Sequence, residues 1–237
     1  MAISILAKSR IFALCVLLSA LAFMFQAVFG ADIQKPAVGD PNRVVKILQE
    51  PRHRQVHRDG EIYVLDVQIN PGDMTLQHTH DAAILYTFIS SGSGPSGGRL
   101  SSNTDYVAKN FTHQVSNEGP GLFRIIALTN YGPPINELKS DRPSGMSADP
   151  EIENAWLRAY AITLQPGKST EMQTHYNPSL IVQTGEGLLH VTREDGITSE
   201  LDSMGSWAWR NANSRYQIQN IGTTPVKITI SEARRAK

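Results

Sequence analysis

Two histidines separated by one residue, His78 and His80, follow a Pro-Gly turn in the stretch INPGDMTLQHTHDAAILYTFISSG, residues 69–92. In an extended strand, residues i and i+2 point to the same face, so the two imidazoles should project together. Imidazole is a common ligand of zinc, iron, copper and nickel. A third ligand has to come from another segment, and His113, at the start of HQVSN, is the candidate. We therefore predict a three-histidine metal site.

The chain repeats this turn and strand ninety-five residues later, as LQPGKSTEMQTHYNPSLIVQTGEG. A later stretch, HQVSNEGPGLFRIIAL, also has a counterpart, YQIQNIGTTPVKITIS. A long internal repeat of this kind indicates two tandem copies of one structural unit. In the second copy the three histidine positions hold Gln173, His175 and Tyr216. Only one strong ligand remains there, so we interpret these residues as a hydrogen-bonded polar pocket, with coordination as the alternative.

The elements that must position these residues are short strands. Apolar residues recur at alternate positions in YVLDVQI, ILYTFIS, LFRIIAL, LRAYAITL, SLIVQT, LLHVT and VKITIS, which is typical of β-strands. Gly, Pro, Asn and Asp separate these runs and favour an all-β sandwich or barrel. Helix is expected only in two short pieces, RVVKILQE and DPEIENAW. The segment NYGPPINELKSDRPSGMSADP, between the copies, has the composition of a linker.

The first thirty residues have the layout of a secretory signal peptide. Lys8 and Arg10 precede the apolar run IFALCVLLSALAFMFQAVFG, which ends in small residues. We expect cleavage near Gly30 and a periplasmic or extracellular protein with no stable membrane anchor; an uncleaved anchor is the alternative. Cleavage would also remove Cys15, the only cysteine of the chain. A formal net charge of zero argues against nucleic acid as a partner.

The spacing around the histidines resembles the first motif of the cupin superfamily, which is Gly, five residues, His-x-His, three or four residues, Glu, six residues and Gly. Here it reads Gly72, DMTLQ, His78-Thr79-His80, DAAI, Leu85, YTFISS and Gly92. The second motif ends in His, three residues and Asn, matched by His113, QVS and Asn117. The resemblance implies a bicupin, with two tandem cupin-type barrels (double-stranded β-helix or jelly roll) in residues 31–135 and 136–237.

One ligand of the family pattern is missing. Its glutamate is replaced by Leu85 in the first copy and by Leu180 in the second. A divalent ion on three neutral histidines would keep its full charge, so we expect it to favour a small anionic or enolisable molecule. The resemblance implies an Fe(II)-dependent oxygenase first, because three-histidine iron sites are found among cupin dioxygenases. Zinc, with lyase or hydrolase chemistry, and manganese, nickel or copper stay open.

Non-enzymatic functions are the alternatives to this enzyme. The missing glutamate and the degenerate second copy also suit a periplasmic protein that binds a small molecule or sugar, or a structural bicupin. The second copy can cover edge strands of the first, as the partner does in a cupin dimer, and a homo-oligomer is possible. No convincing general base is visible in the sequence.

Four further residues receive an interpretation. Arg124 is a possible anchor for an anionic substrate, unless its apolar neighbours point inward and leave it in solvent. His53 and His57 belong to the basic stretch PRHRQVHR and are expected on the surface. His190 follows GEGLL in an alternating run and is interpreted as a paired sheet residue.

Overall fold

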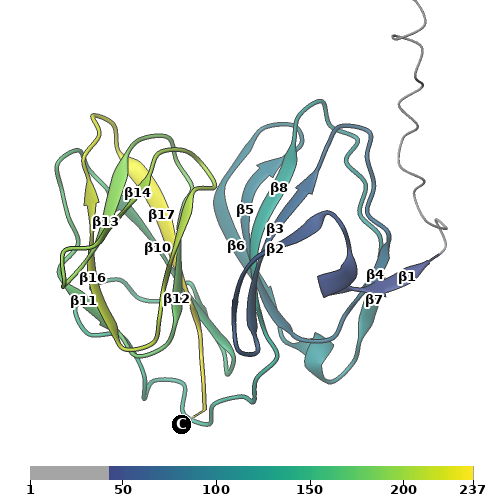
Figure 1. Cartoon of the computed structure of the whole chain (residues 1–237), viewed down its shortest axis with the longest axis horizontal. Helices are drawn as coiled ribbons and strands as arrows, with labels where there is room; N and C mark the ends of the chain where they lie inside the picture. The colour runs from purple at the N-terminus through teal and green to yellow at the C-terminus, as the bar shows by residue number, and fades with distance from the viewer. Residues whose placement is uncertain (1–42, 237) are drawn as a thin grey trace, which may run out of the picture. The chain divides into compact units, whose positions relative to one another are not determined.

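The computed structural model describes residues 43–236, and this part of the chain contains strands and two 3-10 helices but no α-helix (Figure 1). The strands up to Asn130 are β1 (Val44–Lys46), β2 (His53–Asp59), β3 (Ile62–Ile69), β4 (Gln77–His80), β5 (Ala83–Ser91), β6 (Pro95–Asn103), β7 (Phe111–His113) and β8 (Phe123–Asn130). The later strands are β9 (Ile152–Glu153), β10 (Leu157–Leu164), β11 (Gln173–His175), β12 (Ser179–Gln183), β13 (Leu189–Arg193), β14 (Thr198–Leu201), β15 (Trp207–Arg210), β16 (Ser214–Asn220) and β17 (Val226–Ala233).

The first eight strands form two sheets, which we call the N-terminal sheet pair. One sheet has the order β1-β4-β7 and the other β2-β3-β8-β5-β6. Alternate residues of β3 enter different cores, since Val64 belongs to one apolar cluster while Leu65 and Val67 belong to another. Because successive side chains of a strand point to opposite faces, both faces of the five-stranded sheet are buried.

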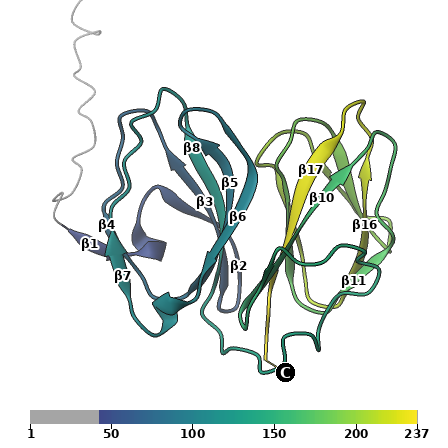
Figure 2. The same ribbon diagram turned by 180° about the vertical axis from the view of Figure 1, so that it is seen from behind.

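The remaining strands form the C-terminal sheet pair, with the orders β15-β12-β17-β10-β9 and β11-β16-β13-β14. Its internal core includes Leu189, Val191 and Ile218. A separate apolar cluster joins the two sheet pairs, with Leu85 from β5 beside Leu180 from β12. Figure 2 shows β5 and β6 on one side of this contact and β10 and β17 on the other.

The internal repeat is visible in individual hydrogen bonds. Asn117 donates through Nδ2 to the carbonyls of Ile69 (2.9 Å) and Gly121 (2.8 Å), and its Oδ1 accepts from the Gly119 N–H (3.0 Å). Asn220 makes the same three bonds in the second copy, at 2.9, 2.8 and 2.9 Å. In each copy, the side-chain amide of the Asn is buried and hydrogen-bonded, and it holds the corresponding turn in place.

All seven stretches predicted as strands are strands, but the two predicted helices are wrong. RVVKILQE contains β1 and the 3-10 helix η1 (Ile47–Gln49), and DPEIENAW contains β9. In the first of these, Val45 and Ile47 are buried while Val44 and Lys46 are exposed. This alternation has the period of a strand, and β1 pairs in parallel with β4.

The segment between the sheet pairs, residues 131–151, contains the predicted boundary at residues 135 and 136. The predicted signal peptide lies outside the described residues. Among residues 43–236 no helix is long and apolar enough to span a membrane.

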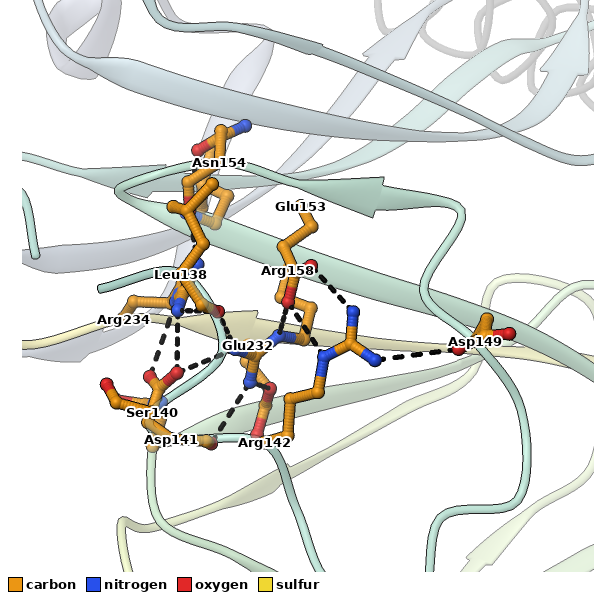
Figure 3. A network of polar contacts seen from close by, with 12 residues as sticks. Leu138, Ser140, Asp141, Arg142, Asp149, Glu153, Asn154, Arg158, Glu232 and Arg234 are labelled. Atoms are coloured by element: carbon orange, nitrogen blue, oxygen red, sulfur yellow. Dashed lines mark hydrogen bonds and ion pairs between the residues drawn. The ribbon is translucent and has the colours of Figure 1, made fainter. Parts of the chain in front are cut away.

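A buried network of charges holds this connecting segment to the C-terminal sheet pair (Figure 3). Arg158 on β10 donates to Asp141 (2.6 Å), Glu153 (2.9 Å) and Glu232 (2.9 Å), and its side chain is fully buried. Arg234 reaches the same Asp141 Oδ1 at 2.6 Å. Burial alone would raise the pKa of Asp141, but hydrogen bonds from the two arginines outweigh it and lower that pKa.

Candidate metal centre

Strands β4 and β7 bring the three predicted histidines together. The strands are antiparallel neighbours, and His78 lies directly opposite His113. His78 and His80 are two residues apart on β4, so both project to the same face, and both are buried. One ligand nitrogen from each of His78, His80 and His113 lies within 4.8 Å of the other two.

Hydrogen bonds set the orientation of these rings. Nδ1 of His78 lies 2.9 Å from the Leu76 carbonyl, so Nδ1 carries the proton and Nε2 keeps a lone pair. Nε2 of His80 lies 3.0 Å from Nε2 of His113. Two nitrogens bound at about 2.1 Å to one ion, at right angles, would be about 3.0 Å apart. The donor set therefore fits a divalent metal ion.

Burial keeps these imidazoles neutral near pH 7. Desolvation is the largest cause, and it lowers the pKa of His80 to about 3 and that of His113 to about 4. The pKa of His78 is also lowered, chiefly by desolvation, and a hydrogen bond to Leu76 opposes part of the change. A neutral imidazole has a free lone pair, which is the form that binds a metal.

A cavity of about 200 Å³ opens beside the three histidines. Its lining residues are Ile47, His53, Leu65, Val67, Ile69, His78, His80, Ile84, Tyr86, Phe88, His113, Val115, Phe123, Ile125 and Ala127. None of them is Lys, Arg, Asp or Glu. The walls are apolar, and the polar atoms come from four imidazoles and one phenol.

Arg124 does not line this cavity. Its neighbours Phe123 and Ile125 do, and the guanidinium on the opposite face is ion-paired with Asp66 at 3.0 Å. Arg124 also donates to the Gly205 carbonyl of the C-terminal sheet pair at 3.1 Å. The structure thus places Arg124 in the contact between the sheet pairs, neither at the histidines nor free in solvent.

The prediction that His53 lies on the surface is wrong. His53 is the first residue of β2, is only 6% exposed and lines the cavity, with its ring 4.5 Å from that of His78. His57 is not a free surface residue either, because its ring packs 4.5 Å from that of Trp209. His190 lies opposite Glu200 as a paired sheet residue. Nothing in the polar stretch around His53 signals burial, since the cavity forms only when β2 and β4 meet.

The residue that faces the cavity at the family's glutamate position is Ile84, one residue before Leu85. Ile84 lines the cavity beside His80, whereas Leu85 belongs to the apolar cluster between the sheet pairs. The motif allows three or four residues after the second histidine, so spacing alone could not separate these neighbours. Adjacent residues of a strand point to opposite faces, and the packing of β5 decides which one is inside.

This difference predicts opposite outcomes for two neighbouring substitutions. Ile84→Glu should place a carboxylate beside the histidines and tighten zinc binding by about tenfold. Leu85→Glu should bury an unpaired charge and lower the free energy of unfolding by about 3 kcal/mol or more, with no gain in zinc affinity. Zinc titration and urea unfolding of both variants test this; equal behaviour of the two would contradict the assignment.

In the second copy the same positions form a closed polar cluster. His175 places Nδ1 2.9 Å from Glu232 and Nε2 3.0 Å from Gln173, so both ring nitrogens are occupied. The ring of Tyr216 stacks on that of His175 at 5.0 Å, and its hydroxyl lies 3.2 Å from that of Ser179. An ion at His175 would have to displace one of these two partners.

The buried histidines should make the metal-free protein less stable as the pH is lowered. Desolvation lowers the pKa of His53 and that of His80 to about 3, against 6.5 when unfolded. Between pH 6.5 and about 3 the unfolded chain therefore binds more protons, and acidification favours unfolding. Each group should contribute up to about 1.4 kcal/mol per pH unit. Urea unfolding with chelator at pH 7, 6 and 5 should show a shallower slope for His80→Asn; an unchanged slope would contradict this.

Comparisons with known proteins give a fold likeness. No family model and no curated protein matches the sequence. Among solved structures, AerE from Microcystis aeruginosa shares 9% identity, with 78% of this chain and 99% of that chain covered and a TM-score of 0.53. A cupin 2 conserved barrel domain protein from Leptotrichia buccalis shares 12% identity, covering 76% and 88%, with a TM-score of 0.50.

A salicylate 1,2-dioxygenase from Pseudaminobacter salicylatoxidans shares 11% identity, with 73% of this chain and 71% of that chain covered and a TM-score of 0.51. At such identities the likeness concerns the fold alone. The activity has to be argued from the site.

Proposed function

Since this chain has a cupin fold, we propose that it is a metal-dependent cupin whose ion is held by His78, His80 and His113. The observation that carries the proposal is the set of three imidazoles whose ligand nitrogens lie within 4.8 Å of one another at the wall of an apolar cavity. The proposed activity is that of an Fe(II)-dependent oxygenase acting on a small anionic or enolisable molecule. Export to the periplasm or cell exterior is part of the proposal and rests on the first thirty residues.

The bound ion would supply Lewis acidity and, if it is iron, access to oxygen chemistry. The protein residues would hold the ion, attract the molecule and exclude water. Three histidines leave open positions on an ion, and none of them neutralises its charge, so an anionic group is attracted. The apolar wall, which includes Phe88 and Phe123, excludes water and packs against the body of the molecule.

A structural neighbour supports oxygenase chemistry over zinc-dependent hydrolysis. A solved structure with the same fold belongs to a dioxygenase, and a variant of that enzyme was crystallised in complex with gentisate.

The experiment combines metal analysis with oxygen uptake. The chain is purified without chelator, its metals are quantified by mass spectrometry, and the iron-loaded protein is screened with small carboxylates, enols and diketones. We expect about one ion per chain and oxygen uptake that His113→Ala abolishes. Uptake that survives in His113→Ala would refute the oxygenase.

A binding protein is the second candidate, favoured by the small number of polar groups on the cavity wall. In that case a small molecule should bind equally well with and without a chelator, and no turnover should accompany binding. Calorimetry in the presence and absence of the chelator separates the two functions.

A further inference from the structure

The cavity contains a fourth histidine, His53, that the three-histidine motif does not include. It enters from β2, whereas the other three come from β4 and β7. Its ring meets that of His78 edge to face, at 4.5 Å and an interplanar angle of 81°. In the second copy the ninety-five-residue shift places Ala148 at this position. His53 is therefore a feature of the N-terminal sheet pair alone.

Hydrogen bonds fix the position and the tautomer of His53. Its backbone N–H donates to the buried carboxylate of Glu50 at 3.1 Å, and Glu50 also accepts from the Leu76 N–H at 3.1 Å. Nδ1 of His53 lies 3.3 Å from the Ile47 carbonyl, which places the proton on Nδ1. Nε2 then carries a lone pair and makes no hydrogen bond to any residue that the structure describes.

His53 stands outside the donor set of the ion. The nitrogens that lie within 4.8 Å of one another belong to His78, His80 and His113. His53 nevertheless lines the same cavity, where the polar side chain that is not an imidazole is the phenol of Tyr86. Burial, followed by the neighbouring Tyr106, raises the pKa of the Tyr86 hydroxyl, so this phenol stays protonated and can donate as well as accept. Nε2 of His53, with the proton on Nδ1, can only accept a hydrogen bond from a molecule at the ion.

We propose that Nε2 of His53 accepts a hydrogen bond from the molecule held at the three-histidine site, and that the site thereby selects small, largely apolar acids that carry a hydroxyl beside the metal-binding oxygen. The inference rests on the proposed metal site. A cavity of about 200 Å³ is smaller than that of a typical drug-sized ligand, so the molecule is small. An analogue that lacks the hydroxyl would leave Nε2 of His53 buried without a hydrogen-bond donor, and this cost lowers the affinity of the site for that analogue.

The test compares two probes that differ by one hydroxyl, mandelate and phenylacetate, on zinc-loaded protein. Zinc is redox-inactive, so calorimetry measures binding without turnover. Chelation by the mandelate hydroxyl adds affinity in every variant, and the informative quantity is the change in the ratio of the two Kd values. His53→Phe keeps a ring against His78 and removes the acceptor; we expect the preference for mandelate to fall about five- to tenfold.

His57→Phe, the same substitution on the same strand but outside the cavity, is the matched control and should leave the ratio unchanged. His53→Gln retains an acceptor and should keep more of the preference than His53→Phe. If His53→Phe does not fold by circular dichroism, His53→Leu takes its place with the same expected loss.

The possible results distinguish a failure of the His53 inference from a failure of the proposed metal site. An unchanged ratio in His53→Phe, or wild type that binds neither probe, would overturn the inference. Loss of zinc from folded His53→Phe would make His53 a metal ligand and overturn it as well. Wild type that binds no zinc would refute the proposed metal site itself, and that failure is visible before any probe is added.

Discussion

Replacing His80 with alanine is expected to empty the metal centre. Bound metal should fall from about one ion per chain to below about a tenth, and any metal-dependent turnover should fall by at least about a hundredfold. The physical reason is that His80 supplies one of three nitrogens and lies 3.0 Å from another, His113. Two remaining imidazoles bind a divalent ion too weakly to retain it through purification. Mass spectrometry of the purified protein measures the change.

The matched control is His190→Ala, because the His190 side chain is hydrogen-bonded to Glu200 on β14 and its strand, β13, belongs to a different sheet from β4. It should retain its metal. The thermal stability of metal-free His80→Ala should be measured in parallel, since His80 is buried and its loss leaves a cavity. Full metal content in folded His80→Ala would disprove the site.

Replacing Arg158 with methionine is expected to destabilise the protein by about 3–5 kcal/mol. The guanidinium is shared by Asp141, Glu153 and Glu232, all within 2.9 Å, and its side chain is fully buried. Methionine fills part of the volume but leaves Glu232, whose side chain is 0% exposed, without its arginine partner, with the His175 imidazole 2.9 Å away still beside it. An uncompensated buried carboxylate is more costly than the pair it replaces. Urea unfolding at pH 7 measures the loss.

Arg142→Met is the control for this prediction. Arg142 contacts the same Glu153 at 2.8 Å, but its side chain is 36% exposed and its second partner, Asp149, is 98% exposed. Exposed ion pairs contribute little, so the change should stay within about 1 kcal/mol. Similar losses in the two variants would show that burial does not set the strength of this network.

The sequence by itself determined seven of the strands, the repeat and the three histidines proposed as ligands. Alternation of apolar residues is a local property, and it reports a strand wherever one face is buried. The spacing His113, QVS, Asn117 matched the second motif of the resemblance, so His113 could be assigned to the site although it lies thirty-three residues from His80 in the chain. A spacing that satisfies a whole motif carries more information than any single histidine.

Only the tertiary structure decided which side chains enter the cavity. Local periodicity cannot distinguish the two faces of β5, which are both apolar, and so Ile84 and Leu85 were not separable. His53 lies in a polar stretch, and it is buried because Glu50 binds its backbone and β2 passes beside the three-stranded sheet. Arg124 finds its partners in Asp66 and in the C-terminal sheet pair. Such contacts join residues far apart in the chain, and no local pattern encodes them.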